Sequence, residues 1–290
     1  MPPPLRDRLA FSTNAFKRNT LAEAVAAIAG AGYGACEIMA DQPHMSPAEL
    51  SAGEMDAMAG LIREHGLKVS NVNAFTGFFA AGKEPTGDTY HPTWLETDKS
   101  ARDLRIAHTV ASIRLAARLG AGTVSLQPGG PTIGTGLSRQ EAGSRFAEGI
   151  AAILPAAREH AITLAIEPEP GLFIQTTGEY RQWKQEFFSA EPPVKMNFDV
   201  GHAFCVGEDP AAIAREMAGE YAHVHLEDIA DTRVHQHLVP GEGAIDFGAF
   251  FHALNAAGYD GWITVELYPF QDDAAGVARR AMKHLSALLK

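Results

Sequence analysis

The sequence is poor in cysteine and has no long apolar run. Its 290 residues include two cysteines, Cys36 and Cys205, which stand far apart and show no CxxC spacing. A disulfide framework and a thiolate zinc site are therefore not indicated, and both cysteines are expected to be buried small apolar residues. No apolar run reaches the roughly 18 residues that a membrane span needs, and residues 1–11 lack the apolar core and cleavage site of a signal peptide. We expect a cytoplasmic protein that does not enter a membrane.

Positive charge is scarce as well. The chain has 24 Lys and Arg against 35 Asp and Glu, which gives a formal net charge of -11. Because this charge would repel a phosphate backbone and no basic stripe overrides it, nucleic acid is not an expected partner. The first β-rich run is also not followed by a GxGxxG motif, which a dinucleotide-binding open sheet would carry there.

What the sequence does contain is a repeated pair of a β-rich run and a helical stretch. The β-rich runs are residues 8–16, 35–40, 68–75, 123–129, 163–170, 194–204, 221–229 and 261–269. The helical stretches are one with Leu21, Val25 and Ile28 on one face, one from Pro47 to Glu64, residues 97–119, 138–159 and 177–188, a short one from Asp209 and Pro210, and residues 246–258 and 273–289. Eight such units with nearly continuous apolar strands predict a (β/α)8 TIM barrel of the α/β class. A doubly wound open sheet is the alternative, since it uses the same units.

The whole chain, residues 1–290, is expected to form a single domain. Glycines follow the predicted helices where each must stop before the next strand, as in AGAGYGA (29–35) and ARLGAGTV (117–124). The one long excursion is the loop 76–98 after the third strand, which contains four aromatic residues. A loop of this length in a barrel is usually a lid or a contact surface. Its Trp94 either covers a substrate ring or packs on the barrel rim.

Acidic and histidine residues stand at the ends of four successive predicted strands. Glu167, Asp199, His225 and Glu266 each lie inside or next to an apolar run. Any one of them taken alone could be a hydrogen-bonded core residue or part of a salt bridge. A buried carboxylate is costly unless it is neutralised, however, and the chemistry of a barrel lies at the C-terminal ends of its strands. The four residues together predict one divalent metal ion, with Mn2+ preferred and Mg2+, Co2+ or Zn2+ as alternatives.

Other polar residues near these strand ends admit two interpretations each. Glu169 is either a substrate contact or a solvated residue on a Pro-braced turn. Glu37, near the end of the second strand, either reaches the pocket mouth or forms an ion pair toward a helix. His223 shares the face of His225 on the same strand and is expected to lie deeper, in the core.

Five motifs make the chain resemble the xylose isomerase-like TIM-barrel superfamily over nearly its whole length. They are AIEPEPG (165–171), FDVGH (198–202), HVHLED (223–228), PGEGAIDF (240–247) and GYDGWITVE (258–266). The functional pattern is similar to that of ketose 3-epimerases, which bind one divalent metal through Glu, Asp, His and Glu. The resemblance places these ligands on Glu167, Asp199, His225 and Glu266, and a substrate contact on His202. Epimerases have an Arg four residues before GEG, where this chain has His237, which puts a ketose substrate in doubt.

Endonuclease IV, a more distant member with three zinc ions, is an informative contrast. Its Asp-x-His triplet before GEG corresponds here to His235, Gln236 and His237, so that His235 would mark a second metal. Its remaining His ligands, however, correspond to Gln127 and Asn73. Together with the net charge of -11, these differences argue against a role in DNA repair.

The resemblance implies an isomerase or epimerase of a sugar, cyclitol or related polyol carbonyl compound. Glu167 and Glu266 would move protons through a metal-stabilised enediolate, with His202 and His237 binding substrate hydroxyls. Expulsion of a β-hydroxyl from the same intermediate would make the enzyme a dehydratase of inosose or dehydroshikimate type. A barrel that only binds a metabolite is the third alternative. The expected partner is a small-molecule substrate, with the formation of homo-oligomers left open.

Overall fold

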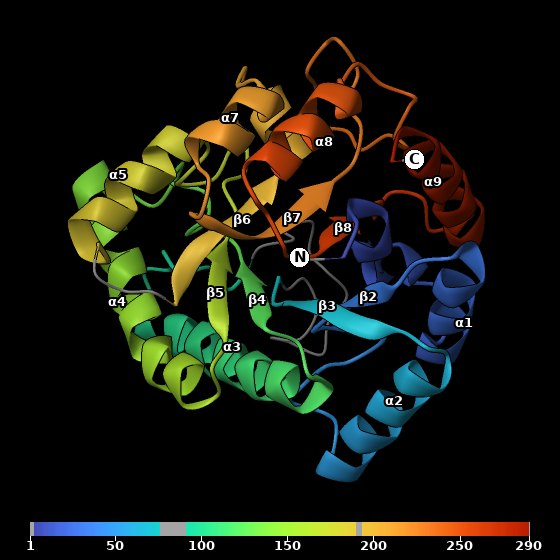
Figure 1. The fold of residues 1–290 in the computed structure, drawn as a ribbon. Coiled ribbons are helices and arrows are strands. Elements are labelled where there is room, and N and C mark those ends of the chain that lie inside the picture. Colours follow the sequence, from blue (N-terminus) through green and yellow to red (C-terminus); the bar gives the residue numbers. More distant parts are fainter. Residues whose placement is uncertain (1–2, 76–90, 190–192, 290) are drawn as a thin grey trace.

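Eight parallel strands close into a barrel in the computed structural model, which describes residues 3–75, 91–189 and 193–289 (Figure 1). The strands are β1 (Leu9–Ser12), β2 (Ala35–Met39), β3 (Lys68–Asn73), β4 (Thr123–Leu126), β5 (Thr163–Ile166), β6 (Val194–Asp199), β7 (Tyr221–Leu226) and β8 (Ile263–Val265). Each strand pairs with the next, and β8 pairs with β1. The predicted (β/α)8 barrel is therefore confirmed, and the open-sheet alternative is wrong because the sheet has no edge.

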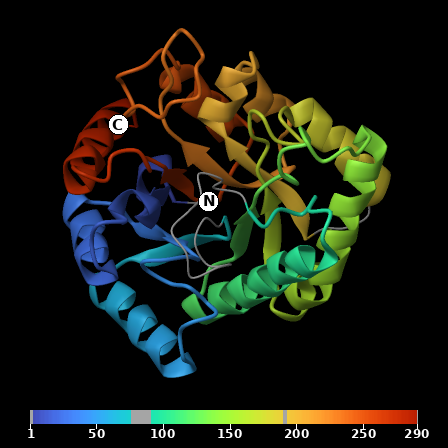
Figure 2. The same ribbon diagram turned by 180° about the vertical axis from the view of Figure 1, so that it is seen from behind.

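The helices form a ring outside the strands, as the views from both sides show (Figures 1 and 2). They are α1 (Leu21–Ala31), α2 (Ala52–Glu64), α3 (Lys99–Leu119), α4 (Arg139–Glu159), α5 (Thr177–Phe187), α6 (Val200–Cys205), α7 (Pro210–Glu216), α8 (Phe247–Ala256) and α9 (Ala274–Leu288). Two short 3-10 turns, Leu5–Arg8 and Thr13–Phe16, flank β1. None of the helices in the described ranges is long and apolar enough to cross a membrane.

Local signals in the sequence explain where the helices begin and end. Four helices start at a capping box, in which a Ser or Thr side chain and a Glu three residues later satisfy each other's backbone N–H groups. Two of the predicted Gly stops, Gly32 and Gly120, adopt positive φ angles of 94° and 74°. Glycine takes this conformation without the steric cost that other residues pay, so the chain can turn from the helix toward the next strand.

Several predicted boundaries differ from the structure, and two of them are wrong for the same reason, a competing cap. The second helix begins at Ala52 and not at Pro47, because Ser51 and Glu54 form a capping box there. The sixth strand ends at Asp199, five residues before the predicted end at 204, because the Asp199 side chain accepts a hydrogen bond from the backbone N–H of His202 and starts α6. The first part of the predicted loop, residues 76–90, lies outside the described residues.

Candidate metal centre

The four residues predicted as metal ligands lie at one level of the barrel, at the C-terminal ends of β5 to β8. Asp199 is the last residue of β6 and is the register partner of His225 on β7. Glu167 directly follows β5, and its backbone N–H donates to the carbonyl of Leu126. Glu266 directly follows β8 and donates in the same way to Leu226. The parallel ladder thus continues one residue beyond each short strand and brings the four side chains together.

The ligand atoms of these four side chains all lie within 4.8 Å of one another. Nδ1 of His225 is the common neighbour: it lies 2.8 Å from Oε1 of Glu167, 3.8 Å from Oε2 of Glu266 and 4.0 Å from Oδ2 of Asp199. All four residues are buried. Three carboxylates around a single imidazole leave an excess of negative charge in a place that water does not reach, which is the arrangement that a bound cation neutralises.

Asp199 shows that these residues fit a metal ion. Its Oδ1 accepts the hydrogen bond from His202 N that caps α6, at 2.7 Å. Its buried Oδ2, which faces His225, has no hydrogen-bond partner among the residues that the structure describes. A buried carboxylate oxygen without a partner is costly, and coordination of a divalent ion would satisfy it. Two Glu, one Asp and one His form an oxygen-rich donor set of the kind that Mn2+, Mg2+, Co2+ and Zn2+ accept.

Glu37 lies inside the barrel, in contact with the predicted ligand His225. Both sequence interpretations of Glu37 are wrong, since the residue is 0% exposed and faces neither the pocket mouth nor a helix. Its Oε2 lies 2.6 Å from Nε2 of His225 and 3.5 Å from Nε2 of His223, and it accepts a hydrogen bond from Asn71. His223 is buried on the same face as His225, as expected. Burial alone would raise the pKa of Glu37, but the charge of His225 and hydrogen bonds from both histidines hold it below its usual range.

Glu227 is a second buried glutamate that the sequence reasoning missed. It has no exposed surface. One oxygen of its carboxylate lies within 4.8 Å of a carboxylate oxygen of Asp199 and a ring nitrogen of His202. Burial, followed by the charge of Asp199, raises the pKa of Glu227 well above its usual range. The signal was present in the sequence: His223, His225 and Glu227 alternate with apolar residues and therefore point to one face of β7.

Glu266 is held by amide groups from two other strand ends. Asn14 donates to its Oε1 at 2.7 Å, and Asn73 donates to the same atom at 3.4 Å. Asn73 thus donates a hydrogen bond to a carboxylate, at the position where endonuclease IV would need a histidine ligand. Burial raises the pKa of Glu266 to about 7, and burial likewise raises the pKa of Glu167 well above its usual range. Glu266 can therefore take up and release a proton near neutral pH.

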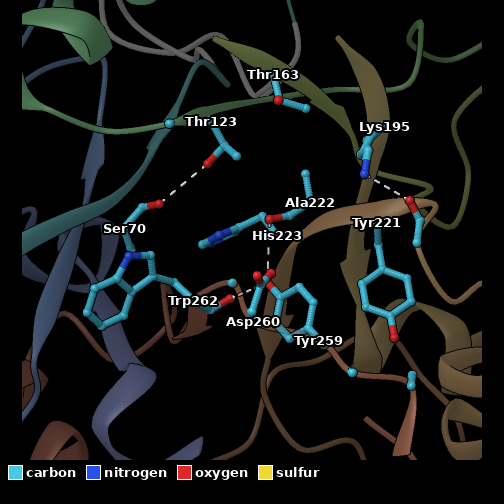
Figure 3. Close-up of a pocket in the computed structure, with 15 residues that line it drawn as sticks. Ser70, Thr123, Thr163, Lys195, Tyr221, Ala222, His223, Tyr259, Asp260 and Trp262 are labelled. Atoms are coloured by element: carbon cyan, nitrogen blue, oxygen red, sulfur yellow. Dashed lines mark hydrogen bonds between the residues drawn. The ribbon is translucent and has the colours of Figure 1, made fainter. Parts of the chain in front are cut away.

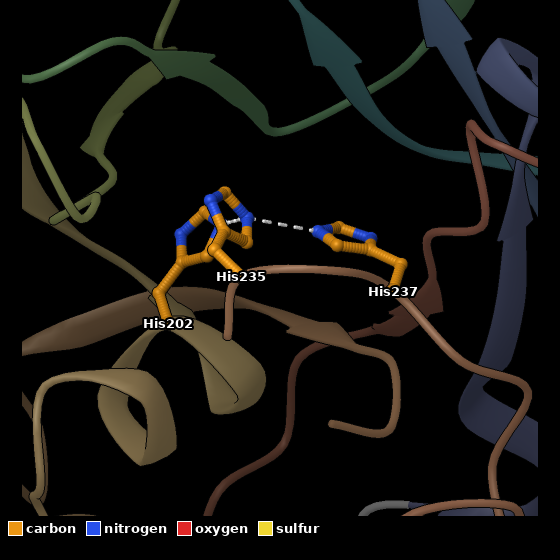
Figure 4. A group of neighbouring side chains, drawn as sticks. All are labelled: His202, His235 and His237. Carbon is orange, nitrogen blue, oxygen red and sulfur yellow. Dashed lines mark hydrogen bonds between the residues drawn. The ribbon is translucent and has the colours of Figure 1, made fainter. Parts of the chain in front are cut away.

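Beside this centre, three histidines converge through their Nε2 atoms (Figure 4). Nε2 of His235 lies 2.9 Å from Nε2 of His202 and 3.2 Å from Nε2 of His237. Nδ1 of His202 contacts the carbonyl of Pro168, and Nδ1 of His237 contacts the carbonyl of Glu266. Both Nδ1 atoms then donate, which leaves the Nε2 lone pairs facing His235.

The three histidines are neutral at pH 7. Burial lowers the pKa of His202 to about 3 and of His237 to about 4, and it also lowers the pKa of His235. A group of neutral imidazole nitrogens can bind substrate hydroxyls or hold a zinc-like cation. The second metal that His235 would mark stays a prediction.

The PGEG signature is a loop wrapped around one carboxylate, that of Asp228. Four backbone N–H groups donate to it, from Ile229, Gly241, Gly243 and Ile245, at distances of 2.8 to 3.2 Å. Any side chain at Gly243 would collide with this carboxylate, since a Cβ there would lie 2.4 Å from Oδ1 of Asp228. The loop that carries His235 and His237 is thereby closed onto the end of β7.

The two remaining predicted substrate contacts, Trp94 and Glu169, are both buried. Trp94 is 2% exposed and packs against Phe146 of α4 with ring centroids 5.9 Å apart, the packing alternative foreseen for it. Glu169 is 5% exposed, so the solvated alternative is wrong, and its backbone N–H donates to the carbonyl of Ile174.

A polar cavity of about 490 Å3 lies at the opposite end of the barrel (Figure 3). The first residues of three strands line it, Thr123, Thr163 and Tyr221, together with the segment 257–262 that precedes β8. In TIM barrels this N-terminal face supports stability, whereas chemistry lies at the C-terminal ends of the strands. His223 also lines the cavity and touches Glu37, so its ring separates the cavity from the candidate metal centre.

Comparisons with known proteins agree with this fold. An inosose dehydratase from Lacticaseibacillus casei is 31% identical over 165 residues, 50% of this chain and 54% of that protein. The chain thus spans about half the length of the first curated relatives that it matches. A solved D-tagatose 3-epimerase-like protein has a TM-score of 0.76 at 20% identity, with 97% of this chain and 98% of that chain covered. A structure of the IolI protein with a bound zinc atom has a TM-score of 0.76 at 17% identity, with the same coverage of both chains.

These two structural likenesses show the fold alone, because both identities are low. A family model, in contrast, matches residues 25–288, which contain every residue of the candidate centre. The chain belongs to the xylose isomerase-like TIM barrel family.

Proposed function

We propose that the protein is a divalent-metal-dependent isomerase or epimerase of a sugar, cyclitol or related polyol carbonyl compound. The observation that carries the proposal is the convergence of Glu167, Asp199, His225 and Glu266 within 4.8 Å, with one oxygen of Asp199 left without a hydrogen bond in the described part of the chain. These four residues would hold one ion. When bound, such an ion polarises a substrate carbonyl and holds the neighbouring hydroxyl oxygen. Tagatose, the sugar named for one solved neighbour, belongs to this substrate class.

Glu167 and Glu266 are proposed as the catalytic pair. They project from β5 and β8, on either side of the strands that carry Asp199 and His225. Burial raises the pKa of Glu266 to about 7, which suits a group that exchanges a proton with a carbon next to a carbonyl. One glutamate of the pair would remove this proton, and the other would return it. Return to the opposite face of the same carbon gives epimerisation, and return to the neighbouring carbon gives isomerisation.

His202, His237 and Glu169 complete the proposed substrate site. His202 and His237 are neutral, so each can accept a hydrogen bond from a substrate hydroxyl at Nε2 while its Nδ1 stays bound to a backbone carbonyl. Glu169 is buried and acidic, which suits a second hydroxyl. Trp94, the fourth contact predicted from the sequence, is assigned to packing, because its ring lies against Phe146 of α4.

Mn2+ is the ion that we propose first, because an oxygen-rich set with a single imidazole suits a harder cation. Zn2+ has separate support from the zinc atom in the solved IolI protein. Mg2+ and Co2+ are accepted by the same donor types.

The test combines metal analysis with solvent isotope exchange. Purified protein is loaded with Mn2+ or Zn2+ and incubated with a panel of ketoses and inososes in deuterated water, because deuterium entry reports removal of the C–H proton whatever the product. We expect exchange to need the metal and to be lost in Glu167→Gln and in Glu266→Gln. Glu242→Gln is the matched control, since Glu242 lies in the PGEG motif but forms an exposed ion pair with Arg280. Full exchange in either site variant, or a wild-type protein without metal and without exchange, would contradict the proposal.

A dehydratase is the second candidate function, favoured by the 31% identity to an inosose dehydratase. The same proton removal followed by loss of a β-hydroxyl would give it. Growth of a conjugated-carbonyl absorbance during turnover of an inosose would support dehydration, and deuterium entry without such absorbance supports isomerisation or epimerisation.

A further inference from the structure

Glu37 is a buried carboxylate that the proposed chemistry does not use. Its side chain comes from β2, on the far side of the barrel from β7, and crosses the interior to reach His225. The two residues are 188 positions apart in the chain. Its Oε2 lies 2.6 Å from Nε2 of His225, and the ion pairs that it forms within the described residues are with His225 and His223. A carboxylate in this place needs a reason, because burying its charge is costly.

His225 is contacted on both nitrogens by groups with different tasks. Its Nδ1 faces the predicted ligands, with Glu167 at 2.8 Å and Glu266 at 3.8 Å. Its Nε2 faces away from them, toward Glu37. An imidazole can offer a lone pair at Nδ1 only when its proton sits on Nε2. A carboxylate within hydrogen-bond distance of Nε2 is the strongest acceptor a protein can place there.

We infer that Glu37 is the positioning residue of the metal centre: it accepts the Nε2–H of His225 and so keeps Nδ1 as the ligand atom. The inference rests on the proposed metal centre and adds to it a residue outside the four ligands. Carboxylates that orient a ligating histidine in this way raise its basicity and fix the plane of its ring.

The surroundings of the two residues support this assignment. Nδ2 of Asn197 lies 3.1 Å from Nδ1 of His225, within reach to donate to a lone pair on that atom when Glu167 does not accept a proton from it. Asn71 donates to the same Oε2 of Glu37 at 2.8 Å and to Ser125 at 2.8 Å, which fixes the carboxylate from the other side. The ring of His225 thus lies between Glu37 at Nε2 and the other three proposed ligands at Nδ1. It is 0% exposed, so the surrounding side chains restrict its rotation.

His223 provides the matched control. It lies on the same strand and is buried, and it faces the same carboxylate, but its Nε2 is 3.5 Å from Glu37 and it is not one of the four proposed ligands. A change at His223 therefore alters the surroundings of Glu37 without removing the acceptor for His225. The His223→Gln variant should keep the metal affinity of the wild type to within about 3-fold, whereas loss of a carboxylate that orients a ligand costs about 10–100-fold.

The first experiment measures affinity for Zn2+ and Mn2+ by competition with a chelator, in wild type, Glu37→Gln, Glu37→Asp and His223→Gln, with circular dichroism to verify folding. In Glu37→Gln the amide can turn its NH2 toward Nε2 and favour the tautomer with the proton on Nδ1, so we expect about 10–100-fold weaker binding. Glu37→Asp keeps an acceptor and should recover part of the affinity. Equal affinity of wild type and Glu37→Gln would overturn the inference while leaving the metal centre intact. A wild-type protein that binds neither ion would refute the proposed function as well.

The second experiment observes the wild-type protein and uses one variant only to assign a signal. Long-range 1H–15N spectra of the zinc-loaded wild-type protein report which nitrogen of each histidine holds the proton and which holds the metal, and His225→Gln identifies the signal. A proton on Nε2 and zinc on Nδ1 of His225 is the expected result. Zinc on Nε2, or a ring without a proton on Nε2, would show that Glu37 does not have this task.

Discussion

Trp94 allows a sharp test of packing against substrate contact, because the two interpretations predict different measurements. Its side chain is 2% exposed, and a Cβ added to Gly149 of α4 would lie 2.6 Å from its ring. The indole therefore occupies space that is available only because residue 149 is a glycine. Replacing a buried aromatic ring by alanine costs about 3–5 kcal/mol. We expect Trp94→Ala to lower the free energy of unfolding in urea by this amount, with a fall in the midpoint of about 1 M or more.

Trp183 provides a matched comparison, since its ring also packs on Phe146, at 4.6 Å against 5.9 Å for Trp94. The indole N–H of Trp183 donates to the carbonyl of Gly143 at 3.1 Å, whereas that of Trp94 has no hydrogen-bond partner among the described residues. Trp94→Phe therefore loses ring volume but also removes an unsatisfied donor. Trp183→Phe loses ring volume and the hydrogen bond to the Gly143 carbonyl. We expect Trp183→Phe to be the more destabilising by about 1–2 kcal/mol.

The assay is urea unfolding followed by circular dichroism, together with KM for a substrate found in the isotope-exchange screen. If Trp94 is a packing residue, both of its variants lose stability and those that remain folded keep KM. An unchanged unfolding midpoint with a raised KM in Trp94→Ala would refute the packing argument and make Trp94 a substrate contact.

Three further predictions concern the loop, the pH dependence and the histidine group. Asp228→Asn should lower the unfolding free energy by at least about 2 kcal/mol in urea titrations, because the four backbone N–H groups on this carboxylate lose charge-assisted hydrogen bonds; an unchanged midpoint would contradict this. Burial, with the charge of Arg105, lowers the pKa of His108 to about 3, so between pH 6.5 and 3 the unfolded chain binds the proton and the folded chain does not. Stability therefore falls as the pH drops below 6.5, by about 2 kcal/mol at pH 5 from this residue, and His108→Gln should lose that share of the decrease in melts at pH 7 and pH 5. His237→Asn should raise KM while metal analysis still finds one ion per chain; a second equivalent in wild type that His235→Asn removes would show instead that the three histidines hold a metal.

The sequence predicted the barrel and the meeting of four polar strand-end residues because both depend on short-range patterns. Glu167, Asp199, His225 and Glu266 each end an apolar strand, and parallel strands place such ends at one edge. The same patterns failed where two local signals compete. Pro47 is a good first residue of a helix, but the capping box of Ser51 and Glu54 outweighs it.

The partners of Glu37 and Glu227 could not be predicted in this way. Glu37 meets His225 only because the sheet closes, and β2 and β7 are not neighbours in it. No periodicity within either strand contains that contact. For Glu227 the alternation along β7 indicated the face but not the depth, and depth decides whether a carboxylate is solvated or holds its proton.

The contacts of the four ligands suggest how they divide the work. Three of them have one polar atom fixed by the protein and another turned toward the centre: Asp199 through the cap of α6, Glu266 through Asn14, and His225 through Glu37. Ligands held in this way need little rearrangement when an ion enters. Glu167 differs, because the side-chain hydrogen bond recorded for it in the described part of the chain is with Nδ1 of His225, the atom that the ion would take. An ion held as proposed would displace that contact and would leave the carboxylate of Glu167 with the greatest freedom of the four, which suits the proposed role of Glu167 as a proton carrier.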